Sequence, residues 1–315
     1  AGTTLGLGQS ATLIGMLHVY YIDTISIPLP TGHRFPQEKY AQLHGALLSE
    51  GVLRPQELIP APPATRDDLL LAHTPAYVDG IEDGSVDPKI IRQIGLPWSP
   101  EMSLRSRTSV GGTIAAARMA LQEGIAGNLG GGTHHAMADQ GQGFCVFNDI
   151  AVAILKLLDE GLIRRAAVID LDVHQGNGTA SILGQREDVF LLSIHGEKNY
   201  PFRKVASTLD VDLPDGAGDA AYLDALHAAL PAVLAFRPEI IFYQAGVDPL
   251  EADRLGRLSL SMLGLAQRDR AVLQTTRTAE IPLVLTMGGG YARPIDLTVQ
   301  AHVQTYRILK QIWHF

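Results

Sequence analysis

The 315-residue chain has little of what would carry it into or across a membrane. It contains one cysteine, Cys145, so no disulfide can form within the chain and a reducing compartment is favoured. It has no apolar run of about 18 residues, so no membrane-spanning helix is predicted. Its N-terminus lacks the basic segment that begins a secretory signal. A cytoplasmic location is therefore expected.

A surplus of basic residues is also missing, since 25 Lys and Arg stand against 33 Asp and Glu, a net charge of -8. This balance argues against a general nucleic-acid binder. No repeat, low-complexity segment or linker divides the chain, so we expect one domain over residues 16–315. Residues 1–15 differ in character from the rest of the chain. They are expected to be a leader foreign to the natural chain or a weakly ordered tail, with Met16 as the natural start.

Short apolar segments alternate with helical patterns along the chain. The apolar segments are rich in Val and Ile, as is typical of buried parallel strands, and they are 18–22, 167–170, 189–194, 240–245 and 283–287. Helices are predicted over 36–48, 110–123, 149–158, 220–235, 262–277 and 294–312. This alternation predicts an α/β fold in which a central parallel β-sheet is flanked by helices on both faces.

Polar residues follow two of the predicted strands. Asp170, Asp172 and His174 alternate along an extended segment, so their side chains point the same way. Asp248 follows the strand over 240–245, and parallel strands place their carboxyl ends at one edge of the sheet. Asp172, His174 and Asp248 are the predicted ligands of a catalytic metal. Zinc suits these donors, and iron(II), manganese and cobalt are compatible with them.

Two glycine-rich segments precede further polar residues. Gly130–Gly132 come before His134 and His135, and two adjacent histidines near a metal can serve as general base and general acid. Gly288–Gly290 come before Tyr291, whose phenol could hydrogen-bond an oxyanion. The alternative interpretation of this second segment is a flexible turn with a surface tyrosine.

In this order, the motifs resemble those of the histone deacetylase family, which has the arginase–deacetylase fold. The matching segments are Gly131-Gly-Thr-His-His135, Gly143-Phe-Cys-Val-Phe-Asn148, Asp170-Leu-Asp-Val-His174, Gly246-Val-Asp248 and Gly289-Gly-Tyr291. Within the family, His174-Gln-Gly-Asn-Gly178 and Glu251-Ala-Asp-Arg-Leu-Gly256 are most similar to class IV members and their bacterial relatives.

The resemblance implies a zinc-dependent hydrolase that cleaves the amide of N-ε-acyl-lysine, whether acetyl or longer fatty acyl, with a metal-activated water. His135 would be the general base and then the general acid, Tyr291 would stabilise the oxyanion, and His134 would give electrostatic support with Asp170 behind it. Asn177 stands where many members have an aspartate, as it does in class IV. An amide partner should leave the pKa of His135 lower than a carboxylate would.

The resemblance also implies two further sets of residues. A substrate tunnel is implied for Gly143, Phe144, Phe202, Leu255, Gly289 and Gly290, with Phe202 as the candidate for the wall opposite Phe144. A monovalent cation, K⁺, is implied beside the zinc at Asp170, Asp172, His174, Ser193 and Ile194. The expected partner is an acyl-lysine protein or peptide, or a small acylated amine. The oligomeric state stays open.

Three other functions are compatible with parts of this pattern. An amidohydrolase of acetylpolyamines or other small N-acyl amines needs the same catalytic residues, and the loops at the tunnel mouth would decide between the substrates. A ureohydrolase needs a second metal, but Gly176 occupies the position of its bridging carboxylate. A non-catalytic acyl-lysine reader would be indicated by a lost ligand or a lost tyrosine, and neither is lost.

Overall fold

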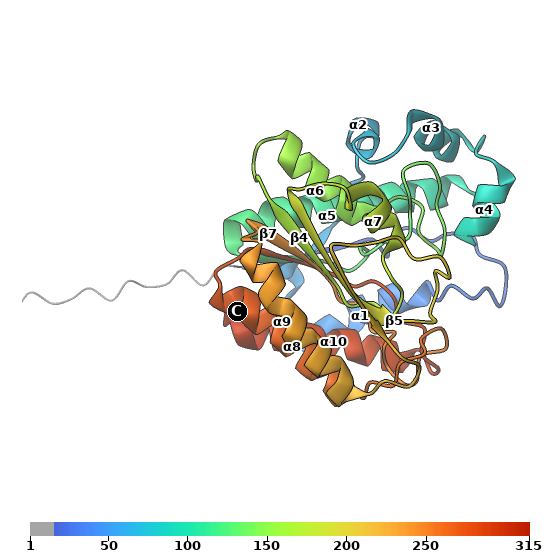
Figure 1. The fold of residues 1–315 in the computed structure, drawn as a ribbon. Helices are drawn as coiled ribbons and strands as arrows, with labels where there is room; N and C mark the ends of the chain where they lie inside the picture. Colours follow the sequence, from blue (N-terminus) through green and yellow to red (C-terminus); the bar gives the residue numbers. More distant parts are fainter. Residues whose placement is uncertain (1–15) are drawn as a thin grey trace, which may run out of the picture.

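Within residues 16–315, which the computed structural model describes, eight parallel strands form one sheet (Figure 1). The expectation for residues 1–15 lies outside this described part. The strands are β1 (His18–Tyr21), β2 (Leu58–Pro60), β3 (Ile125–Asn128), β4 (Ala166–Asp170), β5 (Val189–Gly196), β6 (Leu209–Leu213), β7 (Ile240–Gln244) and β8 (Leu283–Thr286). Their order across the sheet is β2-β1-β3-β8-β7-β4-β5-β6, and every neighbouring pair is parallel.

Helices cover both faces of the sheet (Figure 1). One face carries α1 (Glu38–Ser49), α8 (Asp219–Ala235), α9 (Met262–Thr278) and α10 (Asp296–Trp313). The other carries α2 (Arg66–Leu70), α3 (Pro75–Asp83), α4 (Pro88–Ile94), α5 (Pro100–Glu123), α6 (Asp149–Asp159) and α7 (Asn177–Leu183). A short 3-10 helix, η1 (Pro55–Glu57), precedes β2. None of these helices is both long and apolar enough to cross a membrane.

Side chains of the central strands alternate between two hydrophobic cores. In β4, Ala167 and Ile169 belong to the core beneath α8, α9 and α10, whereas Ala166 and Val168 belong to the core beneath α5 and α6. Both sets are fully or almost fully buried. A period of two with burial on both sides is the pattern expected of a parallel sheet between two helical layers. The predicted fold class is therefore confirmed.

The sequence patterns identify five of the eight strands and miss three short ones. The edge strand β2 has three residues and ends in Pro60, which an edge position tolerates. At the other edge, β6 alternates apolar residues with Asp210 and Asp212. Strand β3 contains Gly127, where a Cβ would lie 2.5 Å from the Tyr306 hydroxyl. None of the three has the Val- and Ile-rich run that indicates a buried strand.

The helical layer that contains α5 and α6 is also larger than the sequence predicts. Helix α5 begins at Pro100 instead of 110, because the Ser99 hydroxyl accepts a hydrogen bond from the Met102 N–H at 3.1 Å and caps the helix. Helices α2, α4 and α7 have between 5 and 7 residues and are missed. Helices this short show too few turns to establish a period.

The strand order brings four loops together. From β3 the chain crosses to β4 and continues to the edge through β5 and β6, and it then returns to place β7 and β8 between β4 and β3. The carboxyl ends of β3, β8, β7 and β4 are therefore adjacent. The glycine-rich segments and the candidate ligands follow these four strands, so the topology gathers them at one edge of the sheet.

His73, just before α3, joins two of the surrounding segments. Its Nε2 accepts a hydrogen bond from the Asn148 N–H at 3.0 Å, so its proton lies on Nδ1, which is 2.9 Å from the Met137 carbonyl. Burial lowers the pKa of His73 to about 4, although the carbonyls of Met137 and Ala138 oppose this shift. The fold therefore needs the neutral imidazole.

Acidification should destabilise the protein through His73. Because the pKa is about 4 in the folded chain and 6.5 ordinarily, the unfolded chain binds the extra proton first. The stabilisation is complete above pH ~6.5 and disappears as the pH falls toward ~4, a loss of about 3 kcal/mol. Melting curves between pH 7 and 4 test this. His73→Gln should lower Tm at pH 7 and flatten its pH dependence, and parallel profiles for the two proteins would contradict the assignment.

Candidate active site

Asp172, His174 and Asp248 converge at the carboxyl edge of the sheet. The first two follow β4, and Asp248 follows the adjacent β7. One donor atom from each lies within 4.8 Å of the others, and all three residues are buried. His174 Nδ1 is 3.0 Å from Asp172 Oδ1 and 3.1 Å from Asp248 Oδ2. The structure therefore brings together the three ligands that the sequence predicts.

The geometry of this donor set fits a divalent metal. Asp172 Oδ2 accepts a hydrogen bond from the Gly289 N–H, and Asp248 Oδ1 accepts one from the Val173 N–H, both at 2.8 Å. One oxygen of each aspartate and Nδ1 of His174 are left facing the same point, which is the donor number of a catalytic zinc site with an open position. A Cβ on Gly289 would lie 2.0 Å from Asp248 Oδ2, so the loop can approach this closely only as glycine.

Burial and mutual contacts shift the pKa values of His174 and Asp248. Burial opposes a charged His174, but its contacts with Asp172 and Asp248 outweigh burial and raise the pKa of His174 to about 10. Burial and the charge of Asp172 raise the pKa of Asp248 to about 7. Two carboxylates this close together require a positive charge beside them. A divalent cation provides that charge and favours the deprotonated ligands.

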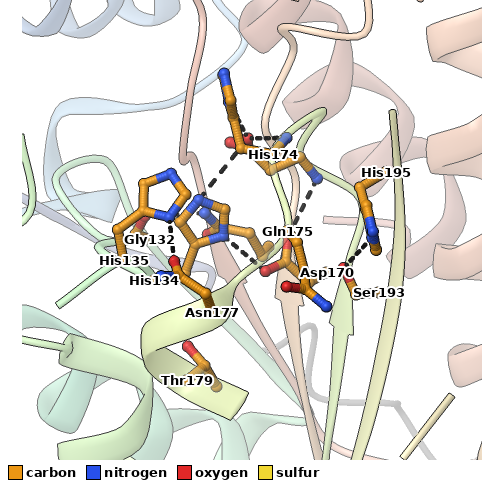
Figure 2. A network of polar contacts seen from close by, with 12 residues as sticks. Gly132, His134, His135, Asp170, His174, Gln175, Asn177, Thr179, Ser193 and His195 are labelled. Carbon is orange, nitrogen blue, oxygen red and sulfur yellow. Dashed lines mark hydrogen bonds and ion pairs between the residues drawn. The ribbon is translucent and has the colours of Figure 1, made fainter. Parts of the chain in front are cut away.

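His134 and His135 lie side by side on the loop after β3, with ring centroids 4.2 Å apart (Figure 2). His134 Nδ1 is 2.7 Å from Asp170 Oδ2, and His135 Nδ1 is 2.8 Å from Asn177 Oδ1. An amide oxygen can only accept, so the proton of His135 sits on Nδ1. Nε2 of His135 is therefore the atom that can take up and return a proton.

The different partners of the two imidazoles separate their pKa values. Burial opposes a charge on His134, but Asp170 and Asp172 outweigh burial and raise its pKa to about 9. Burial, together with positive charge on His134 and His174, lowers the pKa of His135 well below its usual range. One imidazole keeps its proton and the other is a neutral base, which is the separation that distinct acid–base roles require.

Asp149, in the first turn of α6, anchors the loop that carries the histidines. Its carboxylate accepts hydrogen bonds from the N–H of Gly132 at 2.9 Å and of Thr133 at 2.7 Å. On the other side, Gln244 Nε2 donates to the Gly132 carbonyl at 2.9 Å. Gly132 has φ +100°, and a Cβ there would lie 2.2 Å from Gln244 Oε1. The glycine is therefore required by a close approach and by backbone conformation.

The loop after β8, which carries Tyr291, is held by three side chains. The Tyr291 N–H donates to Asp253 Oδ2 at 2.5 Å, and its carbonyl accepts from Arg254 Nε at 3.1 Å. The buried Lys39 Nζ donates to the two carbonyls that flank Gly289, at 3.4 and 3.3 Å. Burial raises the pKa of Tyr291 well above its usual range. The phenol therefore stays protonated and can donate a hydrogen bond.

A cavity of about 450 Å³ is lined by the candidate metal ligands, both histidines and Tyr291. Phe144 lines it with its ring 6.0 Å from the ring of Tyr291. Phe144 has φ +65°, which is uncommon for a residue other than glycine, and its N–H donates to the Ile94 carbonyl at 2.7 Å. A Cβ on the preceding Gly143 would lie 2.7 Å from His135 Cδ2, so the wall contacts the imidazole directly.

Five of the six residues predicted for the tunnel line this cavity, namely Gly143, Phe144, Phe202, Leu255 and Gly289. Gly290 is not among the lining residues, because a Cβ at that position would meet Thr298 and Val247. It belongs to the packing behind the loop, and its carbonyl accepts from Lys39. Leu255 is 39% exposed, which places its side chain toward the solvent end of the cavity.

The sequence-based choice of Phe202 for the wall opposite Phe144 is corrected by the structure. Phe202 is 84% exposed, so it lies at the rim. Tyr200 packs edge-on against His135 with ring centroids 5.1 Å apart, and its hydroxyl bonds to Gln142. The aromatic next to the imidazole of His135 is therefore two positions earlier than predicted. An Asn-Tyr-Pro-Phe segment offers two aromatics, and its sequence alone does not say which one turns inward.

The residues predicted for a monovalent cation are all buried, and they are Asp170, Asp172, His174, Ser193 and Ile194. Asp170 and Ser193 are direct partners in the pairing of β4 with β5. The Ser193 hydroxyl is 2.9 Å from His195 Nδ1 (Figure 2). The predicted set thus adjoins the candidate metal ligands, two of which belong to it, and its cation stays a prediction.

The sequence patterns miss Lys39 and Asp149, which hold the loops of the candidate site, and Tyr200, which packs against His135. Lys39 lies in α1 with no neighbouring motif, and a lysine in a helix is normally solvated. Asp149 starts α6, where an acidic residue is common for helix stability alone. Asp149 could have been suspected from its place directly after the Gly143–Asn148 motif, whereas nothing nearby marks Lys39.

Comparison with known proteins agrees with the geometry. A family model described as "Histone deacetylase domain" matches residues 33–306. An uncharacterized protein of Picosynechococcus is 42% identical over 301 residues, covering 95% of this chain and 100% of that protein. "Histone deacetylase 2" of Arabidopsis thaliana is 34% identical over 271 residues, covering 83% and 70%. A crystal structure of an HDAC homolog complexed with SAHA superposes with a TM-score of 0.81 at 27% identity, covering 95% of this chain and 84% of that one.

The fold and the site together define a hydrolase of the arginase–deacetylase fold, with a candidate metal centre at the carboxyl edge of a parallel sheet. The chain belongs to the histone deacetylase family.

Removing one metal ligand should abolish stoichiometric metal binding. Wild-type protein dialysed with zinc should retain about one equivalent per chain, since three ligands of this kind suffice. His174→Ala and Asp248→Ala should lose it, as elemental analysis would measure. His134→Ala is the matched control, because its ring is also buried but its closest ligand contact is Nε2 to Asp172 Oδ1 at 3.8 Å. Full zinc content in folded His174→Ala would contradict the ligand assignment.

Proposed function

We propose that this protein is a zinc-dependent deacylase that hydrolyses the amide between an acyl group and the side-chain amine of lysine. The observation that carries the proposal is the shared cavity in which Asp172, His174 and Asp248 meet the neutral imidazole of His135 and the phenol of Tyr291. These groups are what amide hydrolysis needs: metal ligands, a base and an oxyanion donor.

When bound at this set, a divalent metal polarises the acyl carbonyl and lowers the pKa of an adjacent water. His135 Nε2 takes the proton of the attacking water and later returns it to the leaving amine. Tyr291 donates its hydroxyl hydrogen bond to the oxyanion. His134, which keeps its proton through Asp170, supplies a positive charge beside His135 and orients it. Phe144 and Tyr200 keep water away from the lysine stem.

Several finer points belong to this proposal. Zinc is the proposed metal, iron(II) is compatible with the same ligands, and K⁺ is proposed beside Asp170 and Ser193. The class IV assignment rests on the resemblance of residues 174–178 and 251–256, and the cytoplasmic location rests on the single cysteine.

Gly176 supports one metal over two, because a Cβ there would already lie 2.4 Å from Asp170 Oδ2. A ureohydrolase centre is therefore disfavoured.

The charges around the cavity favour an acylated peptide over an acetylpolyamine. Six cationic residues line it, and they are Arg34, Arg92, Arg105, Lys198, Arg254 and Arg257. The acidic residues in the same lining are the metal ligands Asp172 and Asp248. A polyamine carries several positive charges that such a lining repels, whereas a peptide can present neutral or acidic residues.

Loss of the proposed base or oxyanion donor should reduce turnover without unfolding the protein. His135→Ala should lower kcat on an acyl-lysine peptide by about 100- to 10,000-fold. Tyr291→Phe should lower it by about 100- to 1,000-fold, because one oxyanion donor is removed. Zinc content and Tm, measured on the same samples, serve as controls. Turnover at the wild-type rate by either variant would refute the proposed role.

The charge argument can be tested by competition between substrates. The zinc-loaded wild-type enzyme should hydrolyse an acetyl-lysine peptide with a higher kcat/KM than acetylspermidine. Raising the ionic strength should bring the two kcat/KM values closer together, since screening weakens the repulsion of the polyamine. Preference for acetylspermidine would move the function to small acylated amines while keeping the mechanism. Failure to hydrolyse any acyl amide would favour a reader.

A further inference from the structure

Two buried cations face the phenol ring of Tyr40, which lines the cavity together with one of them, Arg105. Arg105 of α5 is 5% exposed, and its guanidinium lies 4.3 Å from the ring centroid of Tyr40. Lys39 is 4% exposed, and its Nζ lies 5.3 Å from the same centroid and 4.9 Å from that of Tyr291. Lys39 thus lies near the rings of both Tyr291 and Tyr40, and Arg105 lies near the ring of Tyr40. These contacts connect Arg105 to Tyr291.

Neither cation has a carboxylate partner in the described part of the chain. Lys39 Nζ bonds only to backbone carbonyls, and Arg105 Nη1 has no hydrogen-bond partner although it is buried. Asp23, an acidic residue whose charge acts on Arg105, forms its ion pair with His44. A buried guanidinium with an unused donor costs free energy unless an acceptor reaches it. Arg105 lines the cavity, so the acceptor can come from a ligand.

The inner end of the cavity is continuous with the reaction site. Arg105 precedes Ser109 by one turn of α5, a rise of ~6 Å. The Ser109 hydroxyl donates to the Gly130 carbonyl at 2.6 Å, in the loop that leads to His134. Ile22, Ile27 and Phe35 line the same cavity as Arg105. The cavity therefore combines apolar side chains with the positive charge of Arg105 at its inner end.

We infer that Arg105 forms a carboxylate subsite at the inner end of the cavity, and that the carboxylate it binds is the free end of a dicarboxylic acyl group on lysine. This inference rests on the proposed deacylase function. Methylene groups would lie along the apolar side, and the planar guanidinium would pair with the terminal carboxylate. The six lining cations suit such an acyl group, although the whole chain is acidic.

The reaction needs no reagent beyond water. The amide C–N bond breaks, the C–O bond forms with the oxygen of water, and the two hydrogens go to the amine and the new carboxyl group. The products are lysine and a dicarboxylate. A long apolar acyl tail would press against Arg105 without pairing its charge, so a dicarboxylic acyl group is expected to be preferred over a longer fatty acyl group.

Matched peptides test the inference. Glutaryl-lysine and pentanoyl-lysine peptides have acyl groups of the same length and differ in the terminal carboxylate. The wild-type enzyme should favour glutaryl over pentanoyl in kcat/KM. Arg105→Met should lower that ratio by about 10- to 100-fold, as expected for loss of a charge-assisted bond. Arg105→Lys should give an intermediate ratio, because the charge stays and the planar fork is lost.

Arg118→Met is the control on the same helix, since Arg118 pairs with Glu160 at the surface, and its ratio should equal that of the wild type. The ratio of kcat/KM for glutaryl over pentanoyl is measured on each enzyme separately. The wild-type ratio can therefore be interpreted even if Arg105→Met does not fold. A wild-type preference for pentanoyl would overturn the inference. So would an Arg105 variant that changes only inhibition by free acetate, which would mean that the site binds released product. Absence of turnover on every acyl peptide would instead refute the deacylase function.

Discussion

The burial of several carboxylates at one edge of the sheet is the constraint on which the rest of the site depends. Asp172 and Asp248 are almost completely removed from water. Asp172 accepts two backbone N–H groups and Asp248 accepts one, and both contact the imidazole of His174. Backbone can reach the carboxylates only where no Cβ intervenes. A Cβ on Gly246 would lie 2.3 Å from Asp172 Oδ2, and one on Gly289 would lie 2.0 Å from Asp248 Oδ2. The glycines around the site are therefore consequences of charge burial.

The same constraint separates the two histidines. A buried imidazole loses its charge unless a carboxylate supports it. His134 has that support from Asp170, and His135 has only the amide of Asn177. Two adjacent residues of the same type thus receive opposite protonation states from their hydrogen-bond partners. The sequence-based expectation of a low pKa for His135 agrees with this, but burial is a larger cause than the missing carboxylate.

Charge also distinguishes the cavity from the rest of the molecule. The chain carries a net charge of -8, yet the cavity lining is cationic apart from the metal ligands. This positive local field acts on any molecule that approaches the site, and it cannot be inferred from the net charge of the chain. Arg105 and Lys39 add two positive charges that are shielded from water, and Lys39 lies against the ring of Tyr291.

Local spacing in the sequence was enough to predict which polar side chains meet at the site. The i, i+2 spacing of Asp172 and His174, the tandem histidines and the order of the glycine-rich segments indicated them, because short-range spacing dictates which side chains share a face. The alternation of strands and helices likewise predicted the layered α/β fold. The tertiary structure was needed to show which aromatic turns inward, Tyr200 instead of Phe202, and which cations are buried, Lys39 and Arg105. Such contacts join segments distant in the chain, and only the folded packing brings them together.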